Sequence, residues 1–265
     1  MISRDNLYCS ENNIMKLLRL SLLDKKSVYP VNISSGETTK IIRNILDEGA
    51  WTDSSGKGDP PPDFYSEIYS MMAEVMSVSD NEFEDGGKII NPTAAKMSEM
   101  FRELQKSGAL DGMREDLMIG INAITDLPTE KDHNYGFYKR SLNRVVRKHV
   151  QQIPAYRRNH PGKKLLFIIY DESTAYMEAV NEEMCKNPVK GQIVGGTPHL
   201  WFKDKGLTDS FLKKGIDCII WFTPCKSAED LFIGQVPFPR VCIFDGSKDT
   251  ESRTYQTKRM ISSEI

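Results

Sequence analysis

The stretch LLFIIY at residues 165–170 decides the fold, together with DCIIWFT at residues 217–223. Both runs have the length of a strand, and neither alternates apolar with polar residues as a half-exposed strand does. A third run of this kind is RVCIFD, at residues 240–245. Strands that are apolar on both faces are typical of a sheet covered by helices on each side. The sequence therefore predicts an α/β fold with a mixed central sheet, parallel at its centre and flanked by helices.

Helical patterns surround these strands. The first fifty residues carry apolar side chains at helical spacing, which predicts an N-terminal helical segment, 1–51, packed on a core formed by residues 52–265. The whole chain is expected to form a single domain, with a further strand at residues 117–124. The helices expected in the core cover residues 92–108, residues 138–153 with Pro154 as the stop, and more briefly residues 208–214 and 227–232.

Composition narrows the class of protein. The chain has 265 residues, of which 39% are hydrophobic and 27% charged, so it is long enough to bury a core without cross-links. Its five cysteines form no CxxC pair, and no histidine lies near one at the spacing of a zinc site, which indicates reduced thiols in a cytoplasmic protein. No signal peptide is visible and no apolar run could span a bilayer, so neither secretion nor a membrane partner is expected.

Residues 63–78, DFYSEIYSMMAEVMSV, are compatible with either one helix or a hairpin of two strands. The hairpin is favoured because prolines deliver the chain to Asp63 in an extended conformation and because the segment is rich in aromatics. In a hairpin, Asp63 begins one strand and Glu74 lies on its neighbour, so the two carboxylates meet. Such a pair could hold a hard divalent cation through oxygen ligands. The plainer alternative is that Asp63 caps a turn and Glu74 is a solvated charge.

This arrangement resembles the PD-(D/E)XK phosphodiesterase superfamily, which includes restriction enzymes and many defence and repair nucleases. The match covers residues 61–78, where Asp63 and Glu74 take the positions of the metal-binding carboxylates. An upstream acidic ligand would be Glu37 or Glu48. The resemblance implies a restriction-endonuclease-like core, a Mg²⁺ or Mn²⁺ cofactor and hydrolysis of nucleic-acid phosphodiester bonds, in restriction or phage defence.

The chain departs from the family at one position, because Met76 stands where the motif has a lysine. The lysine positions or activates the attacking water, and a thioether carries no charge and donates no hydrogen bond. Lys96, on the following helix, is one candidate to replace it in catalysis, and Lys88 is another. If no other cation takes over this role, the chain would be a catalytically inactive nuclease-fold module that binds nucleic acid or a protein partner.

A basic segment follows the motif. No acidic residue occurs between His133 and Tyr170, whereas the formal charge of the whole chain is −2. Such segregation suits a polyanion, with DNA expected rather than RNA and a homodimer as one possible assembly. The alternative is a solvated helix face paired with acidic residues such as those at 82–86. The residues expected to contact nucleic acid are Arg140, Arg144, Arg147, Lys148, Arg157 and Arg158.

Two other polar positions could carry chemistry. Asp171 directly follows the strand at 165–170, where ligands of α/β sheets usually bind, while the plainer expectation is that Asp171 or Ser173 caps a following helix. His199, in GGTPHLWF, could act as an acid or base, while packing against its aromatic neighbours is the plainer expectation. No Walker A, GxGxxG or GxSxG motif occurs, which argues against P-loop and α/β-hydrolase chemistry.

Overall fold

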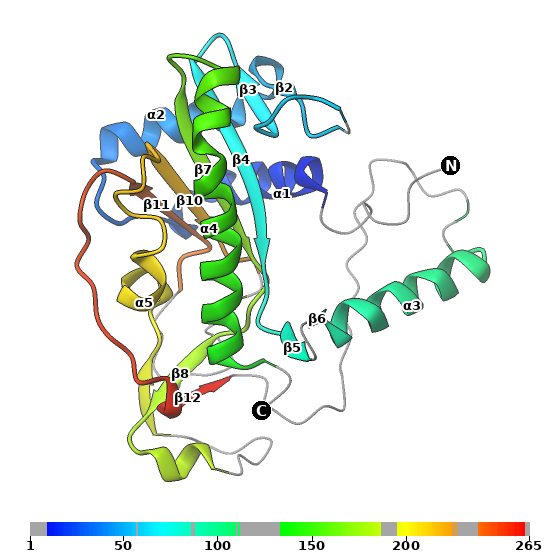
Figure 1. Ribbon diagram of the computed structural model, residues 1–265, viewed down its shortest axis with the longest axis vertical. Helices are drawn as coiled ribbons and strands as arrows, with labels where there is room; N and C mark the ends of the chain where they lie inside the picture. Colours follow the sequence, from blue (N-terminus) through cyan, green and yellow to red (C-terminus); the bar gives the residue numbers. More distant parts are fainter. Residues whose placement is uncertain are drawn as a thin grey trace.

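The computed structural model describes residues 10–56, 58–85, 88–109, 111, 133–186, 195–224, 226 and 238–262. Its centre is a seven-stranded sheet in the order β1-β11-β10-β7-β4-β3-β2 (Figure 1). The strands are β1 (Val28–Pro30), β2 (Thr52–Asp53), β3 (Phe64–Ser66), β4 (Met71–Val78), β7 (Lys164–Asp171), β10 (Cys218–Phe222) and β11 (Val241–Asp245).

The middle of this sheet is parallel. Strand β7 pairs in parallel with β4 on one side and with β10 on the other, whereas β11 and β3 add antiparallel neighbours. Every residue of β10 is buried, and so is every residue of β7 after Lys164. These two strands are those expected at 165–170 and 217–223, so the predicted mixed sheet with a parallel centre is confirmed.

Helices cover both faces of the sheet. The long helix α4 (Tyr135–Asn159) packs against β4 on one face and crosses in front of the sheet in Figure 1. Helices α1 (Glu11–Leu23) and α2 (Ser35–Leu46) pack on the other face, each begun by a serine N-cap. Alternate residues of β4 serve the two cores, with Met72 and Met76 under α4 and Ala73 and Val75 under α1.

Smaller elements complete the described chain. Two further helices are α3 (Pro92–Lys106) and α5 (Lys205–Thr208), and two small sheets lie outside the central one. Their strands are β5 (Phe83–Asp85) with β6 (Lys88–Ile90), and β8 (Tyr176–Ala179) with β9 (Gly196–Pro198) and β12 (Met260–Ser262). The 3-10 helices are η1 (Lys25–Ser27), η2 (Glu48–Ala50), η3 (Glu182–Cys185), η4 (Trp201–Lys203) and η5 (Thr257–Arg259).

Helix α4 continues past Pro154, so the prediction that this proline ends the helix is wrong. Proline removes one backbone donor and crowds the preceding turn, which is a local cost. Tertiary contacts of the last turn offset it. The Tyr156 side chain is buried, and Arg157 binds the carboxylate of Asp217 at 2.7 Å and the carbonyl oxygen of Lys163.

Two other expectations differ from the structure, and a third is confirmed. The N-terminal segment is not helical throughout, because β1 lies within it and pairs with β11 in the central sheet. The helix expected at 208–214 is displaced, since α5 ends at Thr208 and turns follow it. The helix expected at 92–108 is confirmed, ending in a turn at Gly108 with φ +72°. The expected elements at 117–124 and 227–232 lie outside the described residues.

Two observations bear on the class of protein. Cys218 and Cys242 are buried free thiols, as expected from their apolar surroundings, whereas Cys9 and Cys225 lie outside the described residues. Within the part of the chain that the structure describes, no helix is long and apolar enough to cross a membrane.

Candidate functional site

Residues 64–78 form the hairpin that brings Asp63 and Glu74 together. Strands β3 and β4 pair antiparallel with Phe64 opposite Ala73, so Asp63, one residue before β3, continues the register toward Glu74. The Ser66 hydroxyl accepts a hydrogen bond from the backbone of Tyr69 at 3.2 Å and closes the turn between the strands. The hairpin prediction is therefore confirmed, and the single-helix alternative is excluded.

Asp63 is held in place by its neighbour strand. Its Oδ2 atom accepts a hydrogen bond from the backbone amide of Val75 at 2.8 Å, and its side chain is half-buried. Burial, followed by the negative charge of Glu74, raises the pKa of Asp63 to about 8, against the opposing effect of the Val75 hydrogen bond. The charges of Glu11 and Asp53 act in the same direction as that of Glu74. The two carboxylates thus lie close enough to repel one another.

Glu74 is buried with one oxygen bonded and the other free. Its Oε1 atom lies 2.7 Å from Nδ1 of His149 on α4, and the side chain is only 7% exposed. Its Oε2 atom is buried and has no hydrogen-bond partner among the described residues. Buried carboxylate oxygens are normally satisfied, so an orphan oxygen beside a second carboxylate is an unusual feature. It is the only carboxylate oxygen among the buried, unpartnered side-chain atoms of the described chain.

The donor set of this pair fits a hard divalent cation. Mg²⁺ is usually bound through one or two carboxylates, with waters and substrate phosphates completing its shell. Asp63 and Glu74 supply two carboxylates whose mutual repulsion a cation would relieve. The described residues contain no group of three or more His, Cys, Asp or Glu side chains that could form a cage of protein ligands alone. Any cation held here would therefore keep most of its shell open.

The two upstream acids expected as ligands have other partners. Glu37 is exposed in the first turn of α2, where its Oε2 atom accepts a hydrogen bond from the Ser34 hydroxyl at 3.1 Å. Glu48 forms an ion pair with Arg19 at 3.2 Å. The helix acid whose charge acts on Asp63 is instead Glu11, in the first turn of α1. The structure does not join Glu37 or Glu48 to the pair.

The lysine position of the motif lies inside the core. Met76 is 3% exposed and belongs to the cluster beneath α4. Lys96 is exposed on α3, which Figure 1 places beyond the carboxyl-terminal end of β4, whereas Glu74 lies in the middle of that strand. Lys88, exposed at the start of β6, belongs to the same distal region. Neither lysine is among the described groups that bond to Glu74 or shift the pKa of Asp63.

The basic segment divides into paired and unpaired side chains. Arg144 forms an ion pair with Glu82, and Arg157 forms one with Asp217, so both side chains contribute to the stability of the fold. The guanidinium of Arg140 lies over the ring of Phe137, 4.7 Å from its centre. Three of the residues expected to contact nucleic acid are exposed and form no ion pair within the described ranges. These are Arg147, Lys148 and Arg158.

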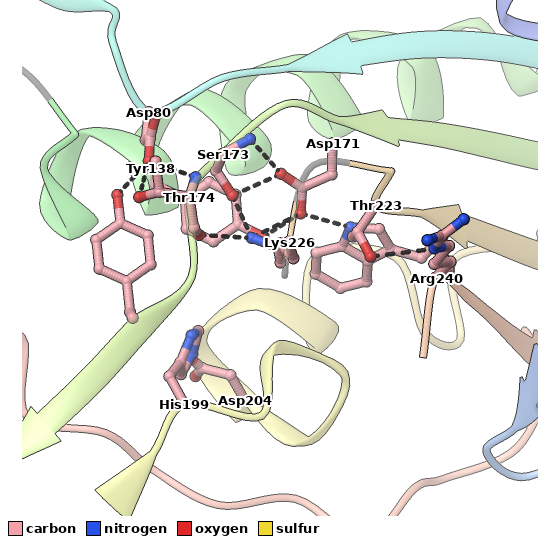
Figure 2. Close-up of polar contacts among 12 residues, drawn as sticks. Asp80, Tyr138, Asp171, Ser173, Thr174, His199, Asp204, Thr223, Lys226 and Arg240 are labelled. Carbon is pink, nitrogen blue, oxygen red and sulfur yellow. Dashed lines mark hydrogen bonds and ion pairs between the residues drawn. The ribbon is translucent and has the colours of Figure 1, made fainter. Parts of the chain in front are cut away.

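A second polar cluster surrounds Asp171 at the end of β7 (Figure 2). Its Oδ2 atom accepts hydrogen bonds from the hydroxyl of Tyr138 at 2.6 Å and from the indole of Trp221 at 2.9 Å. Lys226 points into the same cluster and donates to Ser173 and to the carbonyl oxygen of Thr174. The expected helix cap is wrong, because strand β8 follows instead of a helix. The cluster is buried and its groups are bonded to one another.

His199 belongs to the interior as well. Its side chain is 1% exposed, and Nε2 lies 2.8 Å from Oδ2 of Asp204. The rings of Tyr135, Tyr176 and Tyr255 contact it edge-on. The expected packing of His199 against its aromatic neighbours is therefore confirmed.

The contacts of Glu74 with α4 were missed at the level of sequence. His149 lies three residues after Val146 and seven after Leu142, both buried, so it is a polar residue on the apolar face of the helix. That position was a usable signal for a partner inside the fold. The sequence did not indicate that this partner is Glu74, 75 residues away along the chain.

The chain matches no protein-family model, no curated protein and no solved structure. The geometry of its own residues singles out Asp63 and Glu74, because theirs is the acidic pair with an unused, buried oxygen in the described chain.

Proposed function

We propose that this protein is a metal-dependent nuclease in which Asp63 and Glu74 hold Mg²⁺ or Mn²⁺. The observation that carries the proposal is the buried Oε2 atom of Glu74, left without a partner among the described residues beside a second carboxylate. Burying a carboxylate oxygen without a donor costs free energy, and the raised pKa of Asp63 reflects the cost of ionising both carboxylates. A cation between them would remove both costs. The substrate is nucleic acid, DNA more than RNA, cut by phosphodiester hydrolysis.

The residues around the pair are suited to this reaction. A divalent cation bound here supplies Lewis-acid activation of a phosphodiester and of a water molecule. The Val75 amide orients Asp63, and His149 orients Glu74. Arg147 and Lys148 are exposed on α4, the helix that carries His149, and would contact backbone phosphates.

A second candidate function is favoured by Met76. Because the motif lysine is replaced by a buried thioether, the chain could bind nucleic acid or a protein partner without cutting. In either case the setting we propose is the cytoplasm, in restriction or phage defence. A homodimer would place two such sites on one duplex.

The deciding experiment is cleavage of plasmid and oligonucleotide substrates with Mg²⁺ or Mn²⁺, against an EDTA control. Asp63→Asn and Glu74→Gln should each reduce cleavage to the EDTA background, because each removes an anionic ligand while preserving shape. Glu37→Gln is the matched control, an exposed acid that should leave cleavage unchanged.

Two results would redirect the proposal. Metal-dependent cleavage that persists in both carboxylate variants would place the chemistry elsewhere in the chain. Binding of nucleic acid by the wild type without any cleavage would favour the non-catalytic module.

A further inference from the structure

Helix α4 supplies two side chains that act on the candidate metal ligand Glu74. The Nδ1 atom of His149 lies 2.7 Å from Oε1 of Glu74, and the hydroxyl of Tyr156 lies 3.3 Å from the same Nδ1 atom. Burial, followed by the charge of Glu74, raises the pKa of Tyr156 well above its ordinary value. Both side chains therefore act on one carboxylate.

We infer that His149 and Tyr156 are positioning residues, which hold Oε1 of Glu74 so that Oε2 stays free to bind a divalent cation. This inference rests on the metal site proposed above. It assigns to α4 a function that the hairpin motif alone does not contain. Neither residue needs to touch substrate or the reacting atoms.

The direction of the hydrogen bond follows from the chemistry of the groups. A carboxylate that binds a cation is ionised and only accepts hydrogen bonds, so in the proposed site the N–H of His149 Nδ1 would donate to Oε1. This leaves Nε2 on the opposite side of the imidazole ring from Glu74. Histidine and carboxylate are a common outer-shell combination in metal sites, because the contact fixes the ligand's orientation.

The surroundings keep the two side chains in place. His149 and Tyr156 are seven residues apart, two turns of helix, so they project from the same face of α4. Tyr156 is 1% exposed, and Val146 and Leu142 on that face are fully buried against the sheet. The side chain of His149 is itself only 16% exposed. The carboxylate is thus oriented by a packed helix rather than by a mobile loop.

The methionine at position 76 makes the contact between His149 and Glu74 more important for orienting Glu74. Met76 lies on the same strand face as Glu74 but offers no donor to it. The polar contacts that orient Glu74 within the described chain accordingly come from outside its own sheet, from α4.

The test is the affinity of the full chain for Mn²⁺ and Mg²⁺, measured by isothermal titration calorimetry without nucleic acid. His149→Ala should weaken binding by about 10- to 100-fold, the usual effect of removing an outer-shell partner. His149→Asn should retain most of the affinity, since its amide nitrogen occupies the place of Nδ1. Tyr156→Phe should weaken binding by a few-fold, on the order of one hydrogen bond. Gln151→Ala, exposed on the same helix, is the control.

The outcomes separate this inference from the nuclease proposal. If His149→Ala binds metal as tightly as the wild type while Glu74→Gln does not bind it, the positioning role is overturned and the nuclease remains. If metal binds as expected but no nucleic acid is cut, the nuclease is overturned and the positioning role stands. A wild type that binds neither ion overturns both. If His149→Ala does not fold, Tyr156→Phe is the deciding variant. Unchanged metal affinity in Tyr156→Phe would then overturn the positioning role of both residues.

Discussion

Lys226 and Asp171 form an ion pair inside the protein: Nζ lies 3.4 Å from Oδ2, and the two side chains are 1% and 0% exposed. The ammonium group also lies over the rings of Tyr138 and Trp201, 4.7 Å and 5.2 Å from their centres. The pair joins the end of β7 to a residue that follows β10, two strands that are neighbours in the sheet. Its charges are screened by almost no water.

Removing one partner of this pair should therefore be costly. Lys226→Met should lower the free energy of unfolding by roughly 3–5 kcal/mol, because Asp171 would remain charged and buried without its counter-ion. Adding Asp171→Asn to that variant should recover part of this stability. Urea denaturation measures both. A Lys226→Met protein within about 1 kcal/mol of the wild type would show that the pair is not formed.

The unpaired part of the basic segment should control nucleic-acid affinity. Charge reversal of Arg147 and Lys148 should weaken binding by at least about tenfold, and should flatten its salt dependence by roughly one unit of slope for each phosphate that the protein no longer neutralises. Fluorescence polarisation at several salt concentrations measures both effects. Lys214→Glu, an exposed lysine outside the segment, is the matched control. Equal weakening in both proteins would indicate an effect of net charge alone.

Asp80 should make stability depend on pH in the acid range. It is fully buried, lies 3.1 Å from Nδ1 of His133, and accepts hydrogen bonds from Thr174 at 2.9 Å. Burial alone would raise the pKa of Asp80, but the hydrogen bond and charge of His133, with hydrogen bonds from Tyr176 and Thr174, hold it below its usual value. A folded pKa below the unfolded one stabilises the protein at neutral pH, and this contribution is lost as pH falls through the folded pKa.

Asp80→Asn removes that contribution. It should lower stability at neutral pH by roughly 1–3 kcal/mol, and the difference from the wild type should shrink on acidification to about pH 2. Thermal melting across this range provides the measurement. A difference that stays constant with pH would show that Asp80 does not titrate below its usual range in the folded state.

Met76→Lys should lower the stability of the protein and raise its metal-dependent cleavage activity. The side chain at 76 is buried beneath α4, so an ammonium group there should cost roughly 2–4 kcal/mol of stability. It would also stand two residues from Glu74 on the same strand face, where it could raise metal-dependent cleavage per folded molecule. Met76→Leu, which conserves volume, is the control and should change stability by less than about 1.5 kcal/mol. A lysine variant as stable as the wild type would contradict the buried position of this residue.

The central sheet could be predicted because its signal is local and strong. Runs such as residues 165–170 and 217–223 contain too many apolar side chains to leave a face in water, so they require cover on both sides. The hairpin was favoured but not decided by the sequence, because the prolines and aromatics indicated strands while the apolar spacing also allowed a helix. Once the hairpin forms, its register brings Asp63 and Glu74 together. Strand β1 was not accessible, because three residues carry no periodic pattern.

What the tertiary structure decided is which long-range contacts override local preference. Pro154 is a local stop signal, yet burial of Tyr156 carries α4 past it. The sequence by itself predicted that two carboxylates meet on a hairpin, but it left a single helix open as the alternative. Only the placement of α4 across β4 determined that His149, 75 residues distant, binds one oxygen of Glu74 and leaves the other free. Strand register acts between chain neighbours, whereas such a contact depends on how whole faces of a helix and a sheet bury their apolar side chains together.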